Sequence, residues 1–464
     1  MSTSIKTMLK KPEWVLIFII CMQLFLLFCY NMHRTSNYDE FEAVHTSWKI
    51  LNNERIYVDF FQHHHPYFYY LLLPFIKICG ENIGTVIVLR ILMYCLFTAI
   101  ICITYLIARR ISDSKAALTG ICLLLAVRMF YEKGLELRPD VPQTLFGLLA
   151  ILMLLIYTEK TRLYYLVYSA CALGLSFLFL QKAVFLVFLF VLVLAYGSFF
   201  GKMPRTAIFW FCLFFGLTII PYYAYLFFTD AVKPYWVFNW LVNMKLLERY
   251  SALTTLSRTI EYSLAVWLLY VISIPFMLRH KRLFTILFFS LGMIFSLFCA
   301  KTPYSQYLLP AFPLVAIIAG ITLRNLVAGK TLIFIVIMAA ALGKPVNHII
   351  RDLARPSARE RLDKAAYVLS ITSPGDCVYD GDRRFNLFRR DVDFFWFSLD
   401  PQTGALAAYK MLTGYEYNVC ENIRRLKPKV VSTKYVDNLC DVIHSDYRAD
   451  VLYNDLLCYV TLAE

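Results

Sequence analysis

The chain has 464 residues, of which 59% are hydrophobic and only 17% are charged. A soluble domain is typically about 45–50% apolar and about 25% charged, so this composition excludes an ordinary soluble protein. The net charge of +14 comes without a basic low-complexity arm of the kind that binds nucleic acid. We therefore predict a polytopic membrane protein whose basic residues lie mainly in cytoplasmic loops beside anionic lipid headgroups.

Several hydrophobic runs reach the ~20 residues that a membrane-spanning helix needs. The first, roughly residues 14–32, is too long for the apolar region of a typical signal peptide, and we interpret it as a retained first helix. With it we predict about eleven membrane-spanning helices, because ten further runs have sufficient length and hydrophobicity. They are placed at 84–108, 115–131, 140–157, 163–180, 183–200, 206–228, 259–278, 283–300, 306–323 and 330–346.

Basic residues gather in alternate turns, and the positive-inside rule then orients the chain. The N-terminus is predicted to be cytoplasmic, together with the turns at 108–115, 159–162, 201–205, 279–282 and 323–330. The C-terminal region is predicted to be extracytoplasmic, together with the loops at 33–83, 132–140, 229–258 and 301–305.

The composition changes at Lys344, which predicts a membrane domain over 1–343 and a small α/β domain over 344–464. Strand-like segments stand at 377–380, 430–433 and 458–462, separated by turn signals such as SPGD and DGD. A disulfide between Cys420 and Cys440 is compatible with an extracytoplasmic domain. The domain has no residues at catalytic spacing, and the chain has no CxxC pair that would indicate zinc.

The first predicted outer loop opens with an acidic pair, Asp39 and Glu40. A carboxylate at a membrane edge can have its pKa tuned for base catalysis, although the pair can also simply cap a short helix. The amphipathic sequence that follows, FEAVHTSWKILNN, predicts a helix lying along the membrane surface.

The same loop ends in three consecutive histidines followed by Pro66. Neighbouring residues do not share one face of a helix, and a structural zinc site usually needs about four ligands, so we predict no metal site. His64 and His65 are instead predicted to hydrogen-bond phosphate, sugar or Asp39. The alternative is a polar loop end at which Pro66 begins an interfacial helix.

Four further stretches carry charges at the predicted outer ends of spans or in the predicted outer loops. Arg138 and Asp140 flank a proline, and charges there are costly unless they serve a site, although Asp140 can also favour the helix N-terminus by its dipole. Lys182, between two apolar runs, either extends to the interface or binds a phosphate. The remaining candidates for contacts with a substrate are Lys301 and Tyr307 before the tenth span, and Lys233, Lys245 or Arg249 in the long loop.

Four stretches then follow one another in a familiar order: YDEFEAVHTSWKILNNERIYVDFFQHHHPYFYYLLLPF, ELRPDVPQTLF, LGLSFLFLQKAVFLVFL and YSQYLLPAFPLVAIIAG. Together they resemble the GT-C superfamily of lipid-linked-sugar glycosyltransferases, in the branch of the protein O-mannosyltransferases and the lipid A aminoarabinose transferases. The resemblance covers roughly residues 10–325. Gln306 stands where the family commonly has Arg, and QKAV replaces a Lys-Gly-Pro-like element.

This resemblance implies a function for several residues. Asp39 matches the catalytic carboxylate and Glu40 its neighbour, while Asp140 matches a second acidic position with Arg138 as its basic partner. In the same way Lys182 matches a lysine that binds the lipid phosphate, and His65 matches the His-Pro position. The implied reaction is an inverting transfer of a monosaccharide from a polyprenyl phosphate to an acceptor on a glycolipid, polysaccharide or protein. No nucleotide site is implied, and the need for a divalent metal is left open because relatives differ.

We therefore predict a GT-C glycosyltransferase of the bacterial inner membrane with a carboxylate general base. The bacterial location is favoured by the compact chain, which ends in TLAE and lacks a KDEL retention signal. A transporter or flippase of lipid-linked sugars is one alternative, and it would show charges near the bilayer midplane and an inverted repeat. A membrane scaffold is another, and it would leave Asp39 dispensable. The predicted catalytic residues are Asp39, Glu40 and Asp140, and the predicted substrate-binding residues are His64, His65, Arg138, Lys182, Lys301 and Tyr307.

Overall fold

The computed structural model describes residues 12–201, 203–246, 251–278, 281–355, 359–436 and 440–460, and the chain divides into two compact units. Unit 1 comprises Met1–Met32, Leu92–Tyr222 and Tyr250–Arg355. Unit 2 comprises His33–Ile91, Tyr223–Arg249 and Pro356–Glu464, so two of the predicted outer loops share a unit with the C-terminal region. The division into 1–343 and 344–464 stays a prediction, and its boundary falls inside the continuous helix α18 (Thr331–Leu353).

Unit 1 is built from the apolar helices. Among the described residues, six helices are long and apolar enough to cross a membrane, or up to eight if each of two bent pairs is one span. Each of the eleven predicted ranges overlaps a helix or a bent pair, although three of these helices are apolar over fewer than 18 described residues, namely Leu163–Phe179, Leu283–Cys299 and Ala311–Leu326. The helices that lie wholly or mainly in unit 1 are α2 (Pro12–His33), α5 (Gly84–Ile111), α6 (Ser114–Leu125), α7 (Arg128–Leu135), α8 (Asp140–Lys160), α9 (Leu163–Phe179), η1 (Gln181–Ala183), α10 (Val184–Phe199), α11 (Thr206–Phe228), α14 (Ala252–Tyr262), α15 (Leu264–Met277), α16 (Lys281–Cys299), η3 (Ser305–Leu308), α17 (Ala311–Leu326) and α18.

The bends fall where the sequence interrupts its apolar runs. The predicted span at 115–131 is divided into α6 and α7, which are bent by 72°, and α14 and α15 are bent by 106°. The turn between α9 and α10 is the single 3₁₀ turn η1, which contains Lys182. Polar groups at such breaks leave the regular helix and can line a site.

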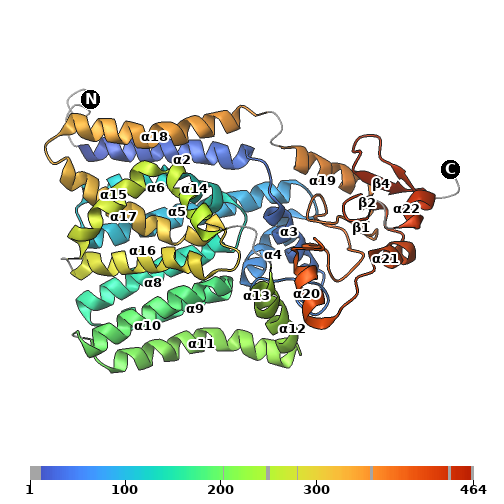
Figure 1. Ribbon diagram of the computed structural model, residues 1–464, viewed down its shortest axis with the longest axis horizontal. Helices are drawn as coiled ribbons and strands as arrows, with labels where there is room; N and C mark the ends of the chain where they lie inside the picture. The colour runs from blue at the N-terminus through green and yellow to red at the C-terminus, as the bar shows by residue number, and fades with distance from the viewer. Residues whose placement is uncertain are drawn as a thin grey trace. The chain divides into compact units, whose positions relative to one another are not determined.

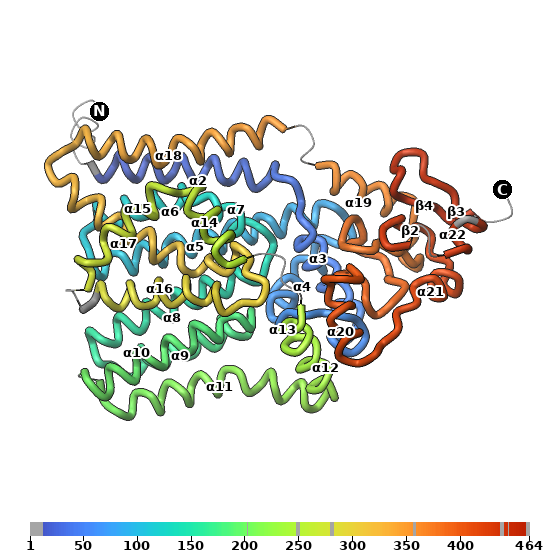
Figure 2. Tube along the Cα trace, viewed as in Figure 1, coloured from blue at the N-terminus to red at the C-terminus, as the bar shows by residue number. Residues whose placement is uncertain are grey.

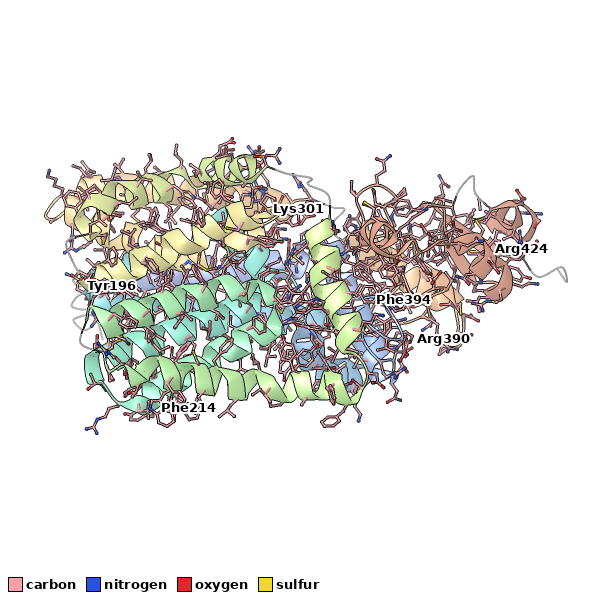
Figure 3. All side chains as sticks on the ribbon, turned by 60° about the horizontal axis from the view of Figure 1, so that its bottom comes forward. Tyr196, Phe214, Lys301, Arg390, Phe394 and Arg424 are labelled. Carbon is pink, nitrogen blue, oxygen red and sulfur yellow. A yellow bond between two sulfur atoms is a disulfide. The ribbon has the colours of Figure 1, made fainter. Side chains whose placement is uncertain are left out.

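Burial within unit 1 separates inner from outer helices. Helix α8 packs against α9 and is 78% buried over its apolar core, whereas the corresponding part of α11 is only 17% buried (Figure 2). Helix α2 lies along α18 (Figure 1), and the side chains of Tyr196 and Phe214 lie on the outer helices α10 and α11 (Figure 3). Large exposed side chains such as Phe18 and Phe188 make an apolar surface that lipid, rather than water, covers. The chain is a membrane protein.

Two glycines let α6 and α17 cross backbone to backbone. A Cβ added to Gly320 would lie 2.4 Å from the backbone nitrogen of Gly120 and 2.8 Å from the carbonyl oxygen of Ala116. Small residues at such crossings are what allows membrane helices to approach closely.

We expect Gly320→Val to destabilise unit 1 by about 1–3 kcal/mol, because the added side chain meets rigid backbone rather than a side chain that can move. Thermal unfolding of the detergent-solubilised protein measures the change. Gly216→Val is the matched control, since a Cβ at Gly216 of α11 meets nothing within 4 Å. An equal loss of stability in both variants would contradict the role of the crossing.

Unit 2 combines the loop helices with a small α/β part. Its four-stranded sheet has the order β1-β2-β4-β3, with β1 parallel to β2 and the other pairs antiparallel. The segments predicted at 377–380, 430–433 and 458–462 correspond to β1, β2 and β4, whereas the three-residue β3 was not predicted. The elements wholly in unit 2 are α3 (Tyr38–Leu51), α4 (Tyr67–Cys79), α12 (Val232–Trp236), η2 (Val237–Val242), α13 (Asn243–Lys245), α19 (Glu360–Ile371), β1 (Val378–Tyr379), α20 (Ala405–Thr413), α21 (Val419–Leu426), β2 (Val430–Ser432), α22 (Asp441–Asp446), β3 (Tyr447–Ala449) and β4 (Leu456–Tyr459).

The predicted pairing of Cys420 with Cys440 is confirmed, and their disulfide links α21 to the start of α22. Several predictions fall outside the described residues: the basic N-terminus at 1–11, the C-terminal TLAE at 461–464 with the end of the third predicted strand, and Arg249. The basic turns at 201–205 and 279–282 are described only in part. The orientation of the termini across the membrane stays a prediction.

Helix α3 differs from the expected surface helix because both of its faces are covered. Residues from Glu40 to Lys49 are all buried. Its polar face meets the C-terminal region, where Asp391 Oδ2 lies 2.8 Å from His45 Nε2 and 2.8 Å from Lys49 Nζ. Burial alone would raise the pKa of Asp391, but the contacts with His45 and Lys49 outweigh it and lower this pKa to about 2. The amphipathic pattern therefore reflects a helix enclosed in unit 2.

Candidate active site

The acidic pair stands on the first turn of α3, and Asn37 caps that helix. The side-chain oxygen of Asn37 accepts hydrogen bonds from the backbone N–H groups of Asp39 at 2.7 Å and Glu40 at 3.2 Å. The capping role considered for the acidic residues is thus filled by Asn37. Consecutive helical side chains point in different directions, so Asp39 and Glu40 enter different surroundings.

Glu40 is buried and binds two arginines of unit 2. Its carboxylate forms ion pairs with Arg34 and with Arg90, whose Nη2 lies 2.9 Å from Oε2. Arg90 also donates to Ser36 Oγ at 2.7 Å. Burial alone would raise the pKa of Glu40, but the two guanidinium charges outweigh it and lower this pKa to about 2. These contacts make Glu40 a structural ion-pair partner, and its catalytic role stays a prediction.

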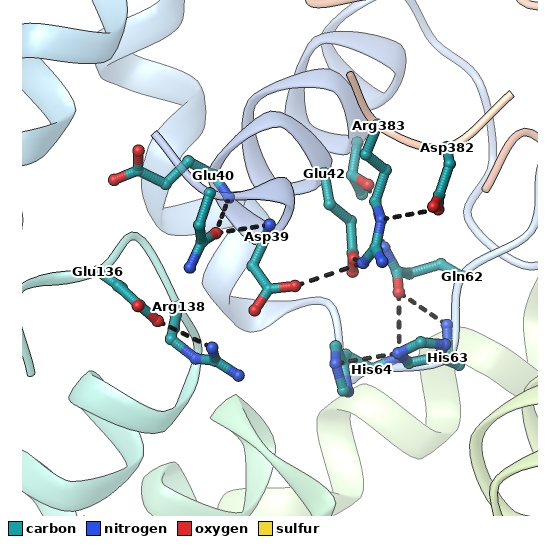
Figure 4. Close-up of polar contacts among 12 residues, drawn as sticks. Asp39, Glu40, Glu42, Gln62, His63, His64, Glu136, Arg138, Asp382 and Arg383 are labelled. Carbon is teal, nitrogen blue, oxygen red and sulfur yellow. Dashed lines mark hydrogen bonds and ion pairs between the residues drawn. The ribbon is translucent and has the colours of Figure 1, made fainter. Parts of the chain in front are cut away.

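Asp39 is half-buried and faces a second carboxylate through a shared arginine. Arg383 Nη1 lies 3.3 Å from Asp39 Oδ1 and also binds Glu42 Oε2 (Figure 4). Burial raises the pKa of Glu42, the Arg383 charge opposes this, and the neighbouring Asp39 charge adds to the rise. Glu42 is therefore a carboxylate with a raised pKa beside Asp39, and perturbed carboxylates are common in catalytic sites.

Arg383 is presented by a tight loop that Asp380 holds. The buried Asp380 carboxylate accepts hydrogen bonds from the backbone N–H groups of Arg384 at 2.6 Å, Phe385 at 2.8 Å and Asn386 at 2.6 Å. Arg383 itself has a φ of +58°. The sequence analysis missed Arg383 because its partners lie more than 300 residues earlier. The available signal was a basic pair directly after the DGD turn.

The histidine loop lies against the same carboxylates, and Gln62 organises it. Its side-chain oxygen accepts the N–H groups of His63 at 2.7 Å and His64 at 3.2 Å, while its amide nitrogen donates to Glu42 Oε1 at 3.3 Å. His63 and His64 are half-buried, with their Nε2 atoms 3.1 Å apart. His65 is completely buried, and its Nε2 lies 2.9 Å from the Tyr235 hydroxyl. Substrate contacts of His64 and His65 stay predictions.

Unit 1 holds a separate cluster in which four predicted residues meet. Arg138 Nε lies 3.3 Å from Asp140 Oδ2, and Lys182 Nζ lies 3.7 Å from Asp140 Oδ1. The ammonium group of Lys182 also lies 3.8 Å from the centroid of the Tyr307 ring. Three segments distant in the sequence therefore form one polar group at the start of α8. Asp140 also stands where a helix dipole favours a carboxylate, as the alternative interpretation expected.

In unit 1 the structure adds Glu136 to the predicted site residues and leaves Lys301 outside their cluster. Glu136, which the sequence analysis did not select, accepts a hydrogen bond from Arg138 Nη1 at 2.9 Å (Figure 4) and one from Lys133 at 2.8 Å. Lys301 is exposed on the surface (Figure 3), and the described residues give it no hydrogen bond or ion pair. Its place in a binding site stays a prediction.

Multiple apolar helices, enclosed loop helices after the first of them and a small C-terminal sheet form a fold that the chain shares with the solved structures of ArnT and of an oligosaccharyltransferase. The profile of the family described as dolichyl-phosphate-mannose-protein mannosyltransferase matches residues 63–225. No curated protein sequence matches the chain significantly.

Among solved structures, the chain is similar to ArnT from Cupriavidus metallidurans bound to undecaprenyl phosphate. The TM-score is 0.71 at 12% identity, over 97% of this chain and 98% of that one. The apo state of the same ArnT gives 0.71 at 13%, with the same coverage. The apo oligosaccharyltransferase of Archaeoglobus fulgidus gives 0.59 at 11%, over 90% of this chain and 69% of that one. The fold is thus ArnT-like, as the resemblance predicted.

Proposed function

We propose that this protein transfers a monosaccharide from a polyprenyl phosphate to an acceptor hydroxyl or phosphate on the extracytoplasmic face of a bacterial inner membrane. The observation that carries the proposal is the ArnT-like fold over nearly the whole chain. It is supported by the lipid in that ArnT structure and by the dolichol phosphate in a structure of the archaeal AglB, which matches with a TM-score of 0.56 at 12% identity.

Asp39 is the base in the proposed reaction. Of the two adjacent acids it is the one whose side chain is partly exposed, 32% against 1% for Glu40. The acceptor oxygen forms a bond to the anomeric carbon from the side opposite the donor phosphate, which inverts that carbon. The bond from this carbon to the phosphate oxygen breaks, its electron pair leaves with the polyprenyl phosphate, and the acceptor proton passes to Asp39. Arg383 holds Asp39 and Glu42 in place.

The unit 1 cluster binds the donor phosphate in this proposal. Arg138 offers a planar set of donors, and Lys182 offers a point charge held over the Tyr307 ring. Charge-assisted hydrogen bonds from both would stabilise the phosphate as it departs, without a general acid. Asp140 contacts both cations and positions them.

The test supplies the purified protein in nanodiscs with radiolabelled polyprenyl-phosphate sugars and a membrane extract as acceptor. We expect release of polyprenyl phosphate and labelling of an acceptor from at least one donor, and no turnover of sugar nucleotides. Binding of donors without turnover of any of them would instead favour a transporter or a scaffold.

Lys182→Met is expected to weaken binding of undecaprenyl phosphate by about 10–100-fold, because one charge-assisted contact to the phosphate is lost. Binding is measured by native mass spectrometry or by quenching of intrinsic fluorescence. Lys160→Met, at the opposite end of α8, is the control and keeps its affinity. If both variants bind the lipid phosphate like wild type, Lys182 has no role in holding it.

A further inference from the structure

Glu42, His63 and His64 bring three metal-ligating side chains together in unit 2. One ligand atom from each lies within 4.8 Å of the other two. We propose that these residues bind one divalent cation with the ligand preference of Zn²⁺. The site differs from the carboxylates that the family resemblance singled out, since neither Asp39 nor Asp140 is among its ligands.

The spacing of the two imidazoles fits a shared ion. Two nitrogens bound to a tetrahedral Zn²⁺ at about 2.0–2.1 Å lie roughly 3.3–3.4 Å apart. His63 Nε2 and His64 Nε2 are 3.1 Å apart, so a small opening of the pair admits the ion. Adjacent histidines can converge here because they stand in an irregular loop, whereas the argument against a metal assumed a helix.

Contacts from other segments fix the backbone that carries the two imidazoles. The Tyr57 hydroxyl donates to the carbonyl of His64 at 2.6 Å, and Asn243 Nδ2 donates to the carbonyl of His63 at 2.9 Å. Gln62 binds both N–H groups and also the carboxylate of Glu42. Such outer contacts hold ligands in the geometry that metal binding needs.

The ligand chemistry selects the ion. Two imidazoles and one carboxylate suit Zn²⁺, and three protein ligands leave a coordination position for water or a substrate oxygen. The formal charges of Asp39 and Glu42 exceed that of Arg383 by one negative charge, which favours a cation. The half-buried histidines leave the ion a path from solvent. In catalysis, which rests on the proposed function, the ion would polarise an acceptor or phosphate oxygen.

Zinc content of the full-length protein tests the site independently of sugar transfer. The protein is stripped with a chelator, titrated with Zn²⁺, dialysed and measured by plasma mass spectrometry. We expect about one equivalent in wild type and at least a 100-fold loss of affinity in His64→Ala and in Glu42→Gln.

The matched control is His348→Ala, because His348 is a half-buried histidine of unit 1 beside Glu132 and Asp352. It is expected to keep the full zinc content. X-ray absorption of the zinc-loaded wild type adds a readout that needs no variant, with nitrogen and oxygen neighbours at about 2.0–2.1 Å. Substoichiometric binding by wild type, or equal binding by wild type and folded His64→Ala, overturns the site. Donor turnover in chelated protein is scored separately, so an inactive transferase that binds zinc refutes the proposed function and leaves the metal site standing.

Discussion

Asp39→Asn is expected to slow sugar transfer by about 10²–10⁴-fold, the contribution of a general base, while the fold and donor binding persist. The amide has almost the same shape as the carboxylate but cannot accept the acceptor's proton. The start of α3 is preserved, because Asn37 caps it through the backbone N–H of residue 39 rather than through its side chain. Arg383 keeps its ion pair with Glu42.

Single-turnover release of polyprenyl phosphate measures the effect, and binding of undecaprenyl phosphate is measured beside it. Asp59→Asn is the control, since Asp59 is a half-exposed carboxylate of unit 2 paired with Arg55 on the surface. Wild-type turnover by Asp39→Asn would remove Asp39 from the mechanism.

Glu40→Gln is expected to lower stability rather than to remove the catalytic base. It should destabilise unit 2 by about 3–5 kcal/mol. The change removes the carboxylate that both Arg34 and Arg90 bind, and it leaves two buried guanidinium groups close together. A neutral amide cannot offset their charge. The variants Asp39→Asn and Glu40→Gln are almost isosteric with the residues that they replace. Comparing them thus distinguishes a loss of catalysis from a loss of folding.

The lowered pKa of Glu40 determines how its contribution to stability changes with pH. The pKa of Glu40 is about 2 in the folded chain, below its ordinary value of 4.5. Its stabilisation is therefore fully present above about pH 5 and is lost as the pH falls toward 2. The difference in unfolding free energy between wild type and Glu40→Gln should shrink over that same interval.

Chemical unfolding in detergent, followed by circular dichroism, measures both stability effects. Glu54→Gln is the matched control in unit 2, because Glu54 is partly exposed and its partner Lys49 keeps a second carboxylate, Asp391. That variant is expected to lie within about 1 kcal/mol of wild type. Stability equal to wild type in Glu40→Gln would contradict the role of the Arg34–Glu40–Arg90 group.

Much of the fold could be predicted because its signals are local. Lipid demands uninterrupted apolar runs, and each predicted span overlaps a helix of unit 1. The strands β1, β2 and β4 follow from short β-branched and aromatic runs between turn signals, and β3 was missed because its sequence, YRA, contains no such run. The disulfide that the sequence allowed between Cys420 and Cys440 is present, but the C-terminal region also contains Cys377 and Cys458, so a shared domain alone did not select this pair.

The membrane-protein class and the resemblance to GT-C transferases could be recognised from the linear chain, because composition, run length and motif order need no tertiary structure. Only the tertiary structure separated Asp39 from Glu40, because one turn of α3 exposes the first carboxylate and buries the second between two arginines. It alone also brought Arg383 to Asp39 and Glu42, and Lys182 to Asp140. Ion pairs between residues tens to hundreds of positions apart depend on how distant backbones approach, and no local pattern in the sequence records that approach.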